Sequence, residues 1–387
     1  MKRPGNRHEN IRAIITGGGT GGHLFPGIAI AESLRETAPG CELLFVGTGS
    51  PIEKRVLPGA GFAFERISAE GIKGRGALAG ARAILKLCAG VFKAARLIVK
   101  FKPDVVIGMG GYSSAPVVIC AMLLGKRIVI CEQNALPGIT NRLLSRFADW
   151  VCVSHEQAAG RLSAKRVSVT GNPVRKSFLK AVEDAGESSA GQDSASDGFT
   201  VFIVGGSQGA HGINMAVTQG LAYIDQELGI KFVHQTGEAD LAMVRKAYES
   251  HGMESVVEPF FNDMACWYRI ADLVICRAGA TTVAEVTCMG KPCIFVPFPG
   301  AADDHQTYNA KALVDAGAAE MIAESGFTGK VFADRVVFYA NHRGILAQMS
   351  KRCRQMGKPD AARRVAKVCL AVASGKINSK PLVCLCT

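Results

Sequence analysis

A glycine-rich turn that ends in a histidine stands near the start of the sequence. Residues 11–27 read IRAIITGGGTGGHLFPG. Glycines let bare backbone amides approach an anionic group, and the N-terminus of a following helix favours negative charge by ~0.3–1 kcal/mol. We therefore expect a diphosphate or sugar-phosphate at this turn, and a tight structural turn is the alternative. His23 is the side chain here that can take up a proton near neutral pH.

Two familiar phosphate motifs do not fit this turn. Residues 17–22 satisfy the dinucleotide pattern G-x-G-x-x-G, but that pattern also requires an acid at the end of the next strand to hold a ribose. The next expected strand, 42–46, runs into Gly-Thr-Gly at 47–49 and offers no acid. The Walker pattern fails as well, because His-Leu at 23–24 replaces Lys followed by Ser or Thr.

Alternating strands and helices must position the turn. The first strand is expected at 11–15 and its helix at about 24–34. A second glycine turn, 108–116, follows the strand 104–109, and a third, 205–210, repeats the opening arrangement. Strands that alternate with helices over most of the chain predict an α/β protein with parallel sheets covered on both faces. We expect two Rossmann-like halves that face each other across a cleft lined by glycine turns.

Length and composition predict two domains. The length of 387 residues exceeds the ~250 residues of a usual single domain, and 48% of the residues are hydrophobic, enough for two cores. We expect an N-terminal domain at 1–170, a C-terminal domain at 171–358 and a helix at about 359–375 that packs back on the first domain. The polar stretch 182–198 is predicted to be a flexible insert.

Several classes of protein are disfavoured by the sequence. No run of 18 or more apolar residues occurs and the N-terminus lacks a signal-peptide core, so we expect neither a transmembrane helix nor export. The 13 cysteines are scattered and are expected to be reduced thiols. Cys384 and Cys386 form only a C-x-C pair in the tail, with no cluster of His or Cys residues beside it, so no metal site is predicted.

The basic charge is concentrated in one segment. The net charge is +12, and residues 70–102 hold eight Lys and Arg against one acid. A helix is expected at 78–100, with basic residues on one face, namely Arg82, Lys86, Lys93, Arg96 and Lys100. Its apolar face is predicted to consist of Leu85, Leu87, Val91, Phe92, Ile98 and Val99. Two interpretations stay open: a solvated outer helix, or contact with an anionic membrane worth ~1 kcal/mol per basic residue.

Eight short segments together are more specific than any one of them. They are GGTGGH (18–23), FP (25–26), GMGGY (108–112), EQN (132–134), GNPVR (171–175), GGSQGA (205–210), RAGATTVAE (277–285) and DHQTYNA (304–310). In order and approximate spacing they resemble the MurG family, the N-acetylglucosaminyltransferases of peptidoglycan synthesis. The resemblance covers the chain outside 182–198 and the C-terminal tail.

The resemblance implies a GT-B fold and an inverting transfer. In that family the N-terminal domain takes the acceptor, N-acetylmuramyl-pentapeptide on undecaprenyl diphosphate. The C-terminal domain takes UDP-N-acetylglucosamine, and the enzymes act peripherally at the cytoplasmic face of the bacterial inner membrane. Since no apolar strand ends in Asp-x-Asp, the usual holder of a divalent ion, we expect amides, hydroxyls and helix N-termini to meet the diphosphate, with no metal or other cofactor.

The same resemblance assigns residues to the two substrates. Those implied for the donor are Thr20, Gly21, Gly22, Asn134, Arg175, Ser207, Phe261, Ala280, Thr281, Thr282, Glu285 and Gln306. Those implied for the acceptor are Gly18, Gly19, Gly110, Gly111, Tyr112 and Glu132. Glu285 would receive ribose hydroxyls, and Phe261 stands where the family has an aliphatic contact to uracil. His23 is the candidate general base, although a histidine that orients an acceptor phosphate would have the same sequence signature.

Two rival functions are weighed against this one. The first is another nucleotide-sugar enzyme, a UDP-N-acetylglucosamine 2-epimerase or a glycolipid glycosyltransferase, which would have the same two Rossmann-like halves. A soluble epimerase would not need the basic helix. A nucleic-acid-binding protein is disfavoured, because aromatic residues make up only 7% of the chain and its charge gathers on one helix. We expect no nucleic-acid partner.

Overall fold

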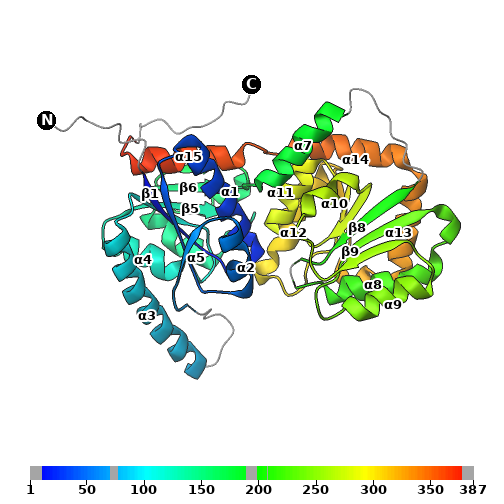
Figure 1. Cartoon of the computed structure of the whole chain (residues 1–387), viewed down its shortest axis with the longest axis horizontal. Coiled ribbons are helices and arrows are strands. Elements are labelled where there is room, and N and C mark those ends of the chain that lie inside the picture. Colours follow the sequence, from blue (N-terminus) through cyan, green and yellow to red (C-terminus); the bar gives the residue numbers. More distant parts are fainter. Residues whose placement is uncertain (1–10, 70–76, 189–197, 207, 377–387) are drawn as a thin grey trace. The chain divides into compact units, whose positions relative to one another are not determined.

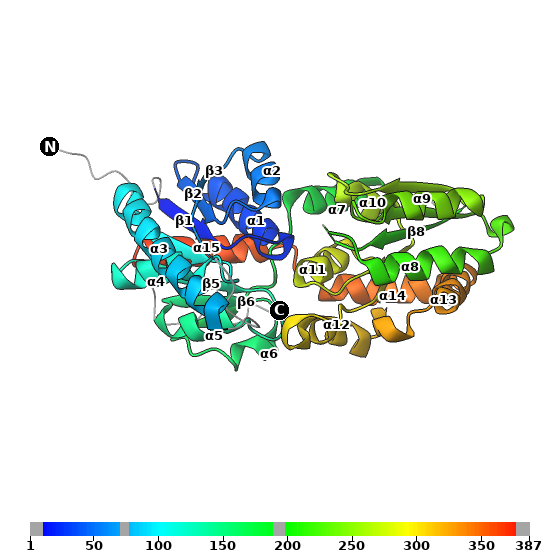
Figure 2. The same cartoon turned by 90° about the horizontal axis from the view of Figure 1, so that it is seen from below.

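The structure is a computed structural model that describes residues 11–69, 77–188, 198–206 and 208–376. These residues form two compact units, shown in Figures 1 and 2. Unit 1 comprises Met1–Arg175 and Pro359–Thr387, and unit 2 comprises Lys176–Lys358. Among the described residues no helix is both long and apolar enough to cross a bilayer. The cysteines in these ranges form no disulfide.

Unit 1 is built on a parallel sheet of seven strands in the order β3-β2-β1-β4-β5-β6-β7, counted over the described residues. The strands are β1 (Arg12–Thr16), β2 (Glu42–Gly47), β3 (Ala63–Arg66), β4 (Val105–Gly108), β5 (Arg127–Glu132), β6 (Trp150–Val153) and β7 (Val167–Val169). The middle residues of β1, β2, β4, β5 and β6 are apolar and buried, as strands covered on both faces require, whereas the edge strands β3 and β7 carry Glu65 and Ser168.

Helices cover both faces because successive side chains of a strand point in opposite directions. In β1, Ala13 and Ile15 pack toward α1, α2 and α15, whereas Ile14 packs toward α3, α4, α5 and α6 (Figures 1 and 2). The helices are α1 (Gly21–Thr37), α2 (Pro51–Gly59), α3 (Ala77–Phe101), α4 (Ala115–Leu123), α5 (Ile139–Leu144), α6 (Glu156–Ala159) and α15 (Ala361–Ala373), with the 3-10 turn η1 (Ser145–Phe147) after α5.

The basic helix α3 exposes two of the residues that the sequence assigned to its apolar face. Phe92 and Val99 are 62% and 61% exposed, so the prediction is wrong for them, whereas Ile98 of the same predicted face is fully buried. The helix packs through Gly90, Ala94 and Ile98, spaced by four residues. A Cβ on Gly90 would lie 2.2 Å from the Ser68 carbonyl oxygen, so glycine there lets α3 approach its neighbours closely.

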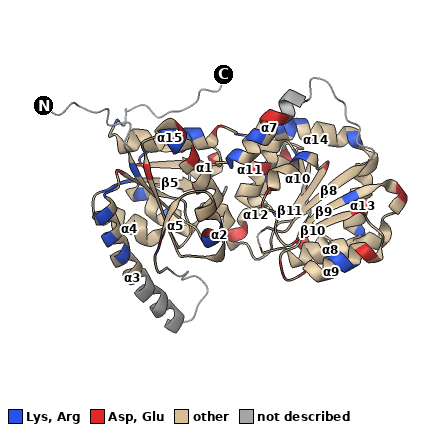
Figure 3. Cartoon of the chain, in the orientation of Figure 1, with Lys and Arg blue, Asp and Glu red and all other residues tan. Residues whose placement is uncertain are grey.

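The charged side of α3 therefore carries apolar side chains as well. Lys93, Arg96 and Lys100 are exposed, and the Arg96 guanidinium lies 4.5 Å from the centroid of the Phe92 ring. Figure 3 shows the basic residues along the described part of this helix. The side chains of Arg82 and Lys86 lie outside those that the structure describes.

Unit 2 repeats the architecture with a parallel sheet of six strands in the order β10-β9-β8-β11-β12-β13, again counted over the described residues. The strands are β8 (Phe199–Val204), β9 (Ile230–Gln235), β10 (Ser255–Glu258), β11 (Leu273–Cys276), β12 (Cys293–Phe295) and β13 (Ala319–Met321). The two parallel sheets with helices on both faces confirm the predicted fold class.

The helices of unit 2 also form two layers. Val201 and Ile203 of β8 pack toward α8, α9 and α13, and Phe202 packs edge-on against Tyr268 of α10, with ring centroids 5.2 Å apart. Helix α14 contacts both α11 and α13. The helices are α7 (Lys176–Ser188), α8 (His211–Gly220), α9 (Leu241–Ser250), α10 (Met264–Ile270), α11 (Ala280–Met289), α12 (His305–Asp315), α13 (Gly329–Asn341) and α14 (Arg343–Met356), with 3-10 turns η2 (Leu221–Tyr223), η3 (Gln226–Leu228), η4 (Ala302–Asp304) and η5 (Glu324–Gly326).

The predicted insert is partly helical. Residues 182–188 belong to α7, so the prediction of a flexible segment is wrong for them, and residues 189–197 lie outside the described ranges. Helix α7 packs through Phe178, which is fully buried and lies with its ring centroid 5.4 Å from that of Tyr268. This apolar anchor extends the helix into a sequence whose composition alone favours disorder.

Candidate active site

The strand order places a glycine turn at the switch point of each sheet. In unit 1 the order reverses between β1 and β4, and the turns at 17–22 and 109–114 follow these two strands. In unit 2 it reverses between β8 and β11, which are followed by the turns at 205–210 and 277–279. Ligands of such sheets bind beyond the carboxyl ends of the strands at the switch point. Four of the eight segments that the sequence singled out thus lie where the topology favours a ligand.

The first turn in unit 1 needs glycine at its start. Gly17 has φ +125°, and a Cβ there would lie 2.8 Å from the Cβ of Met109. The N–H of Gly18 donates to Ser113 Oγ at 3.0 Å, which ties the two turns together. Helix α1 then begins at Gly21, earlier than the predicted start near Leu24.

Three backbone N–H groups at the start of α1 have no hydrogen-bond acceptor among the described residues. Thr20 is the N-cap of α1 but its side chain makes no capping hydrogen bond. No described residue accepts a hydrogen bond from the N–H groups of Gly19, Thr20 or Gly21. The first N–H groups of a helix lack partners within it, so these amides can receive an anion.

A carboxylate that the sequence did not predict stands beside this turn. Glu53, in the first turn of α2, is 1% exposed and accepts a hydrogen bond from the Ser50 N–H in a capping box. A Cβ on Gly18 or Gly47 would lie within 2.0 Å of its Oε1 atom. The acid belongs to the helix cap, and these two glycines make room for it.

His23 lies in the first turn of α1, between two other segments. Its Nδ1 atom is 3.1 Å from Oε1 of Gln133, and the Gln133 amide nitrogen donates to the Cys131 carbonyl at 3.2 Å. The opposite edge of the ring faces the second glycine turn, where a Cβ on Gly111 would lie 3.3 Å from Nε2. The structure thus brings the candidate base to the turn at 108–112, and Gln133 is a partner that the sequence analysis missed.

Glu132 organises the loop after β5. Its carboxylate is buried and accepts hydrogen bonds from the N–H groups of Asn134 and Gly138 at 3.0 and 3.1 Å and from Asn141 Nδ2 at 2.8 Å. Glu132 and Asn134 therefore meet through a direct contact. Tyr112 lies on the neighbouring turn with 48% of its surface exposed, and its hydroxyl would be 3.7 Å from a Cβ on Gly19.

The GNPVR segment closes unit 1. Arg175 holds its guanidinium 4.2 Å from the centroid of the Phe25 ring, in the helix that carries His23. Asn172 is 6% exposed, and neither amide atom has a hydrogen-bond partner among the described residues. A buried amide without a partner is costly, so Asn172 is a ligand-contact candidate that sequence reasoning did not find.

The glycine turn of unit 2 packs against a second glycine turn. A Cβ on Gly209 would lie 2.0 Å from the Thr236 carbonyl oxygen, and one on Gly237 would lie 2.4 Å from the Gln208 carbonyl oxygen. Only glycine allows the two backbones to approach so closely. Ser207, the predicted diphosphate contact, lies outside the described residues.

Gln235 joins this turn to the segment that carries Phe261. Its amide nitrogen donates to the Gly206 carbonyl at 2.8 Å, and its oxygen accepts from the Phe261 N–H at 2.9 Å. The Phe261 ring is 6% exposed and lies 5.1 Å, centroid to centroid, from Trp267. Its ring therefore packs in an aromatic cluster, and its backbone is what the Gln235 bridge positions.

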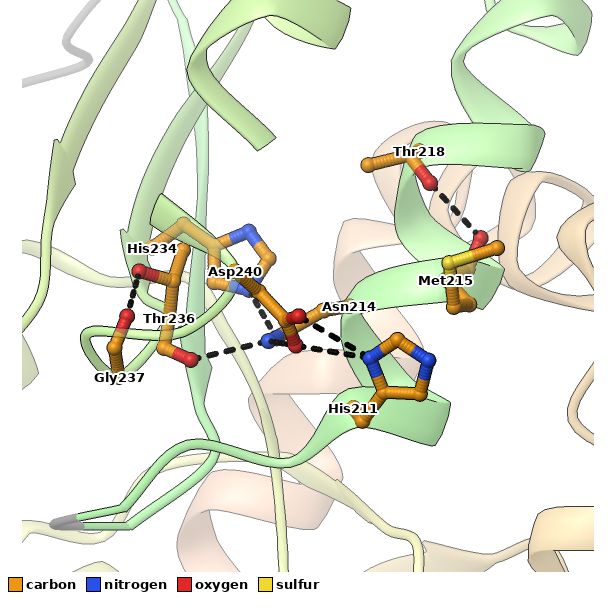
Figure 4. Close-up of polar contacts among 8 residues, drawn as sticks. All are labelled: His211, Asn214, Met215, Thr218, His234, Thr236, Gly237 and Asp240. Atoms are coloured by element: carbon orange, nitrogen blue, oxygen red, sulfur yellow. Dashed lines mark hydrogen bonds and ion pairs between the residues drawn. The ribbon is translucent and has the colours of Figure 1, made fainter. Parts of the chain in front are cut away.

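A polar network lies beneath the same turn (Figure 4). His234 is fully buried, and its Nε2 and Nδ1 atoms contact Asn214 Oδ1 at 3.0 Å and Tyr248 Oη at 3.2 Å. Asn214 donates to the Thr236 carbonyl and to Asp240, which also contacts the exposed His211. Burial lowers the pKa of His234 to about 3, although nearby Asp240 opposes this shift. His234 is therefore neutral at physiological pH.

Helix α11 carries the predicted ribose ligand at the other side of this switch point. Glu285 is 5% exposed, so it is not a solvated helix residue. Thr281 is buried, Ala280 is the first residue of the helix and Thr282 is half-buried. The first turn of α11 and a buried carboxylate one turn later thus follow β11 directly.

The segment before α12 is strained. Asp303 and Asp304 have φ 54° and 53°, in the left-handed region. This conformation is unfavourable by on the order of 1–3 kcal/mol for a residue with a Cβ and is found often at ligand sites. Next to them, Gln306 accepts a hydrogen bond from the Phe298 N–H at 2.9 Å. Within the described ranges, no group of three or more His, Cys, Asp or Glu residues is arranged to hold a metal ion.

Comparison with known proteins bears on both units. Residues 13–153 match the glycosyltransferase family 28 N-terminal domain, and residues 200–365 match its C-terminal domain. A transferase of Syntrophus aciditrophicus is 45% identical over 94% of this chain and 99% of its own length. One of Myxococcus xanthus is 44% identical over 93% of this chain and 92% of its own length. Both are named UDP-N-acetylglucosamine–N-acetylmuramyl-(pentapeptide) pyrophosphoryl-undecaprenol N-acetylglucosamine transferase.

Solved structures agree with these relatives. MurG of Acinetobacter baumannii is 32% identical, with a TM-score of 0.70, and the match covers 93% of this chain and 99% of that one. A UDP-N-acetylglucosamine 2-epimerase of Neisseria meningitidis has a TM-score of 0.64 over 92% of this chain and 98% of its own, but at 13% identity this likeness shows the fold alone. The resemblance drawn from the eight sequence segments is confirmed, and the chain belongs to the MurG family of GT-B glycosyltransferases.

Proposed function

We propose that this chain transfers N-acetylglucosamine from UDP-N-acetylglucosamine to the C4 hydroxyl of N-acetylmuramyl-pentapeptide on undecaprenyl diphosphate. This step makes lipid II from lipid I in peptidoglycan synthesis. The observation that carries the proposal is the 45% identity, over 94% of the chain, to a transferase whose name states these substrates. The glycine turns at the switch point of each unit give both diphosphates a suitable binding geometry.

We assign the donor chiefly to unit 2. The departing UDP gains negative charge as its bond to the anomeric carbon breaks, so donors of hydrogen bonds aimed at the diphosphate lower the barrier. The turn at 205–210, including Ser207, leads into α8 and suits this role. Glu285 is proposed to accept the ribose hydroxyls, a role that suits a carboxylate in the first turns of a helix directly after β11. Gln306 is assigned to the sugar hydroxyls.

We assign the acceptor to unit 1, with His23 as general base. The attacking hydroxyl forms a bond to the anomeric carbon on the face opposite UDP, so the configuration at this carbon is inverted. As this bond forms and the bond to UDP breaks, the proton of the hydroxyl passes to the imidazole. His23 supports this role because its Nε2 edge faces the glycine turn at 110–111, which the acceptor diphosphate is proposed to contact. The open amides of Gly19, Thr20 and Gly21 offer a second anion contact next to it.

We further propose that the outer side of α3, α4 and α5 contacts the cytoplasmic face of the inner membrane. These helices cover one face of the sheet of unit 1, and their outer sides expose large apolar residues. The residues are Phe92, Val99, Leu123, Ile139 and Leu143. Exposed apolar residues among cations suit an anionic lipid surface. Burial of the apolar side chains in the membrane and attraction of the cations to anionic lipids both contribute to the binding free energy.

Binding to vesicles tests this membrane surface. The double variant Phe92→Ser and Leu123→Ser should bind phosphatidylglycerol vesicles about tenfold or more weakly, because two exposed apolar anchors are lost. Tyr223→Ser is a matched control, as Tyr223 is 61% exposed but belongs to unit 2. Equal vesicle binding by the double variant and the wild type would contradict the assignment of this surface.

A transfer assay tests the reaction itself. We expect labelled N-acetylglucosamine to pass from its UDP donor to a lipid-diphosphate muramyl acceptor in β linkage, with EDTA present or absent. Incubation with UDP-N-acetylglucosamine alone should leave the sugar unchanged, whereas an epimerase would convert it. His23→Ala should lower kcat by ~10²–10⁴. A loss confined to the acceptor KM would assign His23 to binding instead.

A further inference from the structure

We propose that Gln133 is a positioning residue for the transfer reaction. Its amide holds His23 in the tautomer that carries the proton on Nδ1 and leaves Nε2 free to accept one from the attacking hydroxyl. This proposal rests on the role of His23 as general base. Three contacts carry it: those of the Gln133 amide with Cys131 and with His23, and that of the His23 ring with the glycine turn at 110–111.

The contact with Cys131 fixes which way the amide points. The Cys131 carbonyl oxygen can only accept hydrogen bonds, and it lies 3.2 Å from the end of the Gln133 side chain. That end must therefore be the NH₂ group. The other end, 3.1 Å from Nδ1 of His23, is then the amide oxygen, which has no proton to give. Chemistry rather than the shape of the amide decides this orientation.

The orientation of the amide decides the tautomer. Two acceptors do not form a hydrogen bond, so Nδ1 of His23 must carry the proton that it donates to Gln133. A neutral imidazole has one such proton, which leaves a lone pair on Nε2. Nε2 is also the nitrogen that lies along the second glycine turn, 3.3 Å from where a Cβ on Gly111 would stand. The basic nitrogen and the space opened by the glycines therefore coincide.

Gln133 is held firmly enough for this task. It is 2% exposed and directly follows β5. The same Cys131 carbonyl also accepts from Asn141 Nδ2 at 3.1 Å, and Asn141 binds the Glu132 carboxylate. Residues on both sides of Gln133 are thus tied to one another, which restricts rotation of its side chain.

The side chain that hydrogen-bonds to His23 is uncharged. Among the described residues, none with a carboxylate is within hydrogen-bond distance of His23. The ionisable groups on the neighbouring segments are occupied elsewhere or exposed: Glu132 binds its own loop, Glu53 caps α2, the Arg175 guanidinium lies over Phe25 and Tyr112 is half-exposed. An amide oxygen orients the ring and, because it is uncharged, stabilises an imidazolium less than a carboxylate would.

Two substitutions separate orientation from folding. Gln133→Met removes the acceptor at similar size and should lower kcat about 3- to 10-fold, with the KM for UDP-N-acetylglucosamine within about twofold of wild type. Gln133→Glu places a carboxylate beside Nδ1, which favours the imidazolium. The acidic limb of its kcat/KM profile should therefore move up by about one pH unit, and activity should return in part at high pH. Gln157→Glu, exposed in the same unit, is the matched control and should leave the profile in place.

A double-mutant cycle and an NMR measurement complete the test. In a His23→Ala background, Gln133→Met should have no further effect on kcat, because Gln133 acts only through the imidazole. Nitrogen-15 shifts of His23 should report a protonated Nδ1 in the wild type and a mixture of tautomers in Gln133→Met, whether or not transfer is assayed. An unmoved acidic limb in Gln133→Glu, or a protonated Nε2 in the wild type, would overturn the inference alone. An unchanged kcat for His23→Ala would instead overturn the base assignment on which it rests.

Discussion

Replacing His234 by Gln should remove much of the pH dependence of the stability of unit 2. His234 is fully buried and neutral in the folded protein, where its pKa is lowered to about 3 by burial, against 6.5 for the unperturbed side chain. Its partners favour the neutral form. Asn214 donates its amide hydrogens to Thr236 and Asp240, so its oxygen accepts from Nε2–H, and Nδ1 accepts from the Tyr248 hydroxyl.

The magnitude follows from these two pKa values. Because the unfolded chain binds a proton below pH 6.5 and the folded chain does not until about pH 3, the stabilising effect of a neutral His234 is complete above pH 6.5 and is lost as the pH falls toward 3. At pH 5 the loss amounts to about 2 kcal/mol of the free energy of unfolding. Gln cannot titrate, so this part of the pH dependence should vanish in His234→Gln. The lost hydrogen bonds should also cost roughly 1–3 kcal/mol at every pH.

The two tryptophans of the chain allow unit 2 to be followed alone. Trp267 lies in unit 2 and Trp150 in unit 1, so a Trp150→Phe background leaves Trp267 fluorescence as the reporter of urea unfolding. Free energies of unfolding at pH 7.5 and pH 5 would be compared for the parent, His234→Gln and the control His342→Gln, which changes an exposed histidine of the same unit. The control should keep the slope of the parent. A slope in His234→Gln as steep as that of the parent would refute the buried neutral histidine.

Two further predictions concern the donor side. Glu285→Gln should weaken the binding of UDP and of UDP-N-acetylglucosamine together by about 10- to 100-fold in calorimetric titrations, because the ribose hydroxyls lose the charge of their acceptor and one of its two oxygens. Unchanged UDP affinity would remove Glu285 from the ribose site. Gln235→Leu leaves the Gly206 carbonyl and the Phe261 N–H without their partner, so the KM for the donor should rise about 3- to 10-fold. A matching rise in the acceptor KM would show general loss of structure instead.

The sheets could be predicted because their signals are local. Most strands are short apolar runs that end in glycine or a polar turn, and β1, β2 and β4 stand close to the runs at 11–15, 42–46 and 104–109 from which they were expected. The start of α1 was missed because glycine is a poor helix former, so Gly21 and Gly22 were expected to belong to the turn. In the structure only Gly17 and Gly19 of this stretch have positive φ, and Gly21 and Gly22 are already helical. Tertiary packing of the helix overrides that local propensity.

The faces of α3 show what periodicity alone cannot decide. Phe92, Arg96 and Val99 are spaced by four and three residues and therefore share one side of the helix. Hydrophobicity favoured burial of Phe92 and Val99. The helix instead packs through Gly90 and Ala94, because small residues permit a closer approach than large ones. Which stripe is buried depends on the shape of the partner surface, which the sequence of one helix does not contain.

The site divides along the same line. Glycine turns and motif residues such as His23 and Glu285 have sequence signatures, whereas the amides that orient them do not. Gln133 meets His23 across 110 positions of the chain, and Gln235 meets Phe261 across 26. Only the order of strands in each sheet brings these pairs together. A buried glutamine has no sequence pattern that separates such a role from ordinary packing.

The use of glutamine in both units has a common electrostatic reason. Gln133 and Gln235 each donate to a backbone carbonyl and offer an oxygen to a group beside a glycine turn, so each fixes a separation between two segments. Glutamate could accept at both positions but could not donate, and its charge would repel a diphosphate bound at either turn. Lysine could donate but not accept. A neutral side chain with both functions positions an anion-binding turn without changing the charge that the substrate meets, and Gln133→Glu tests this reasoning directly at the first of the two turns.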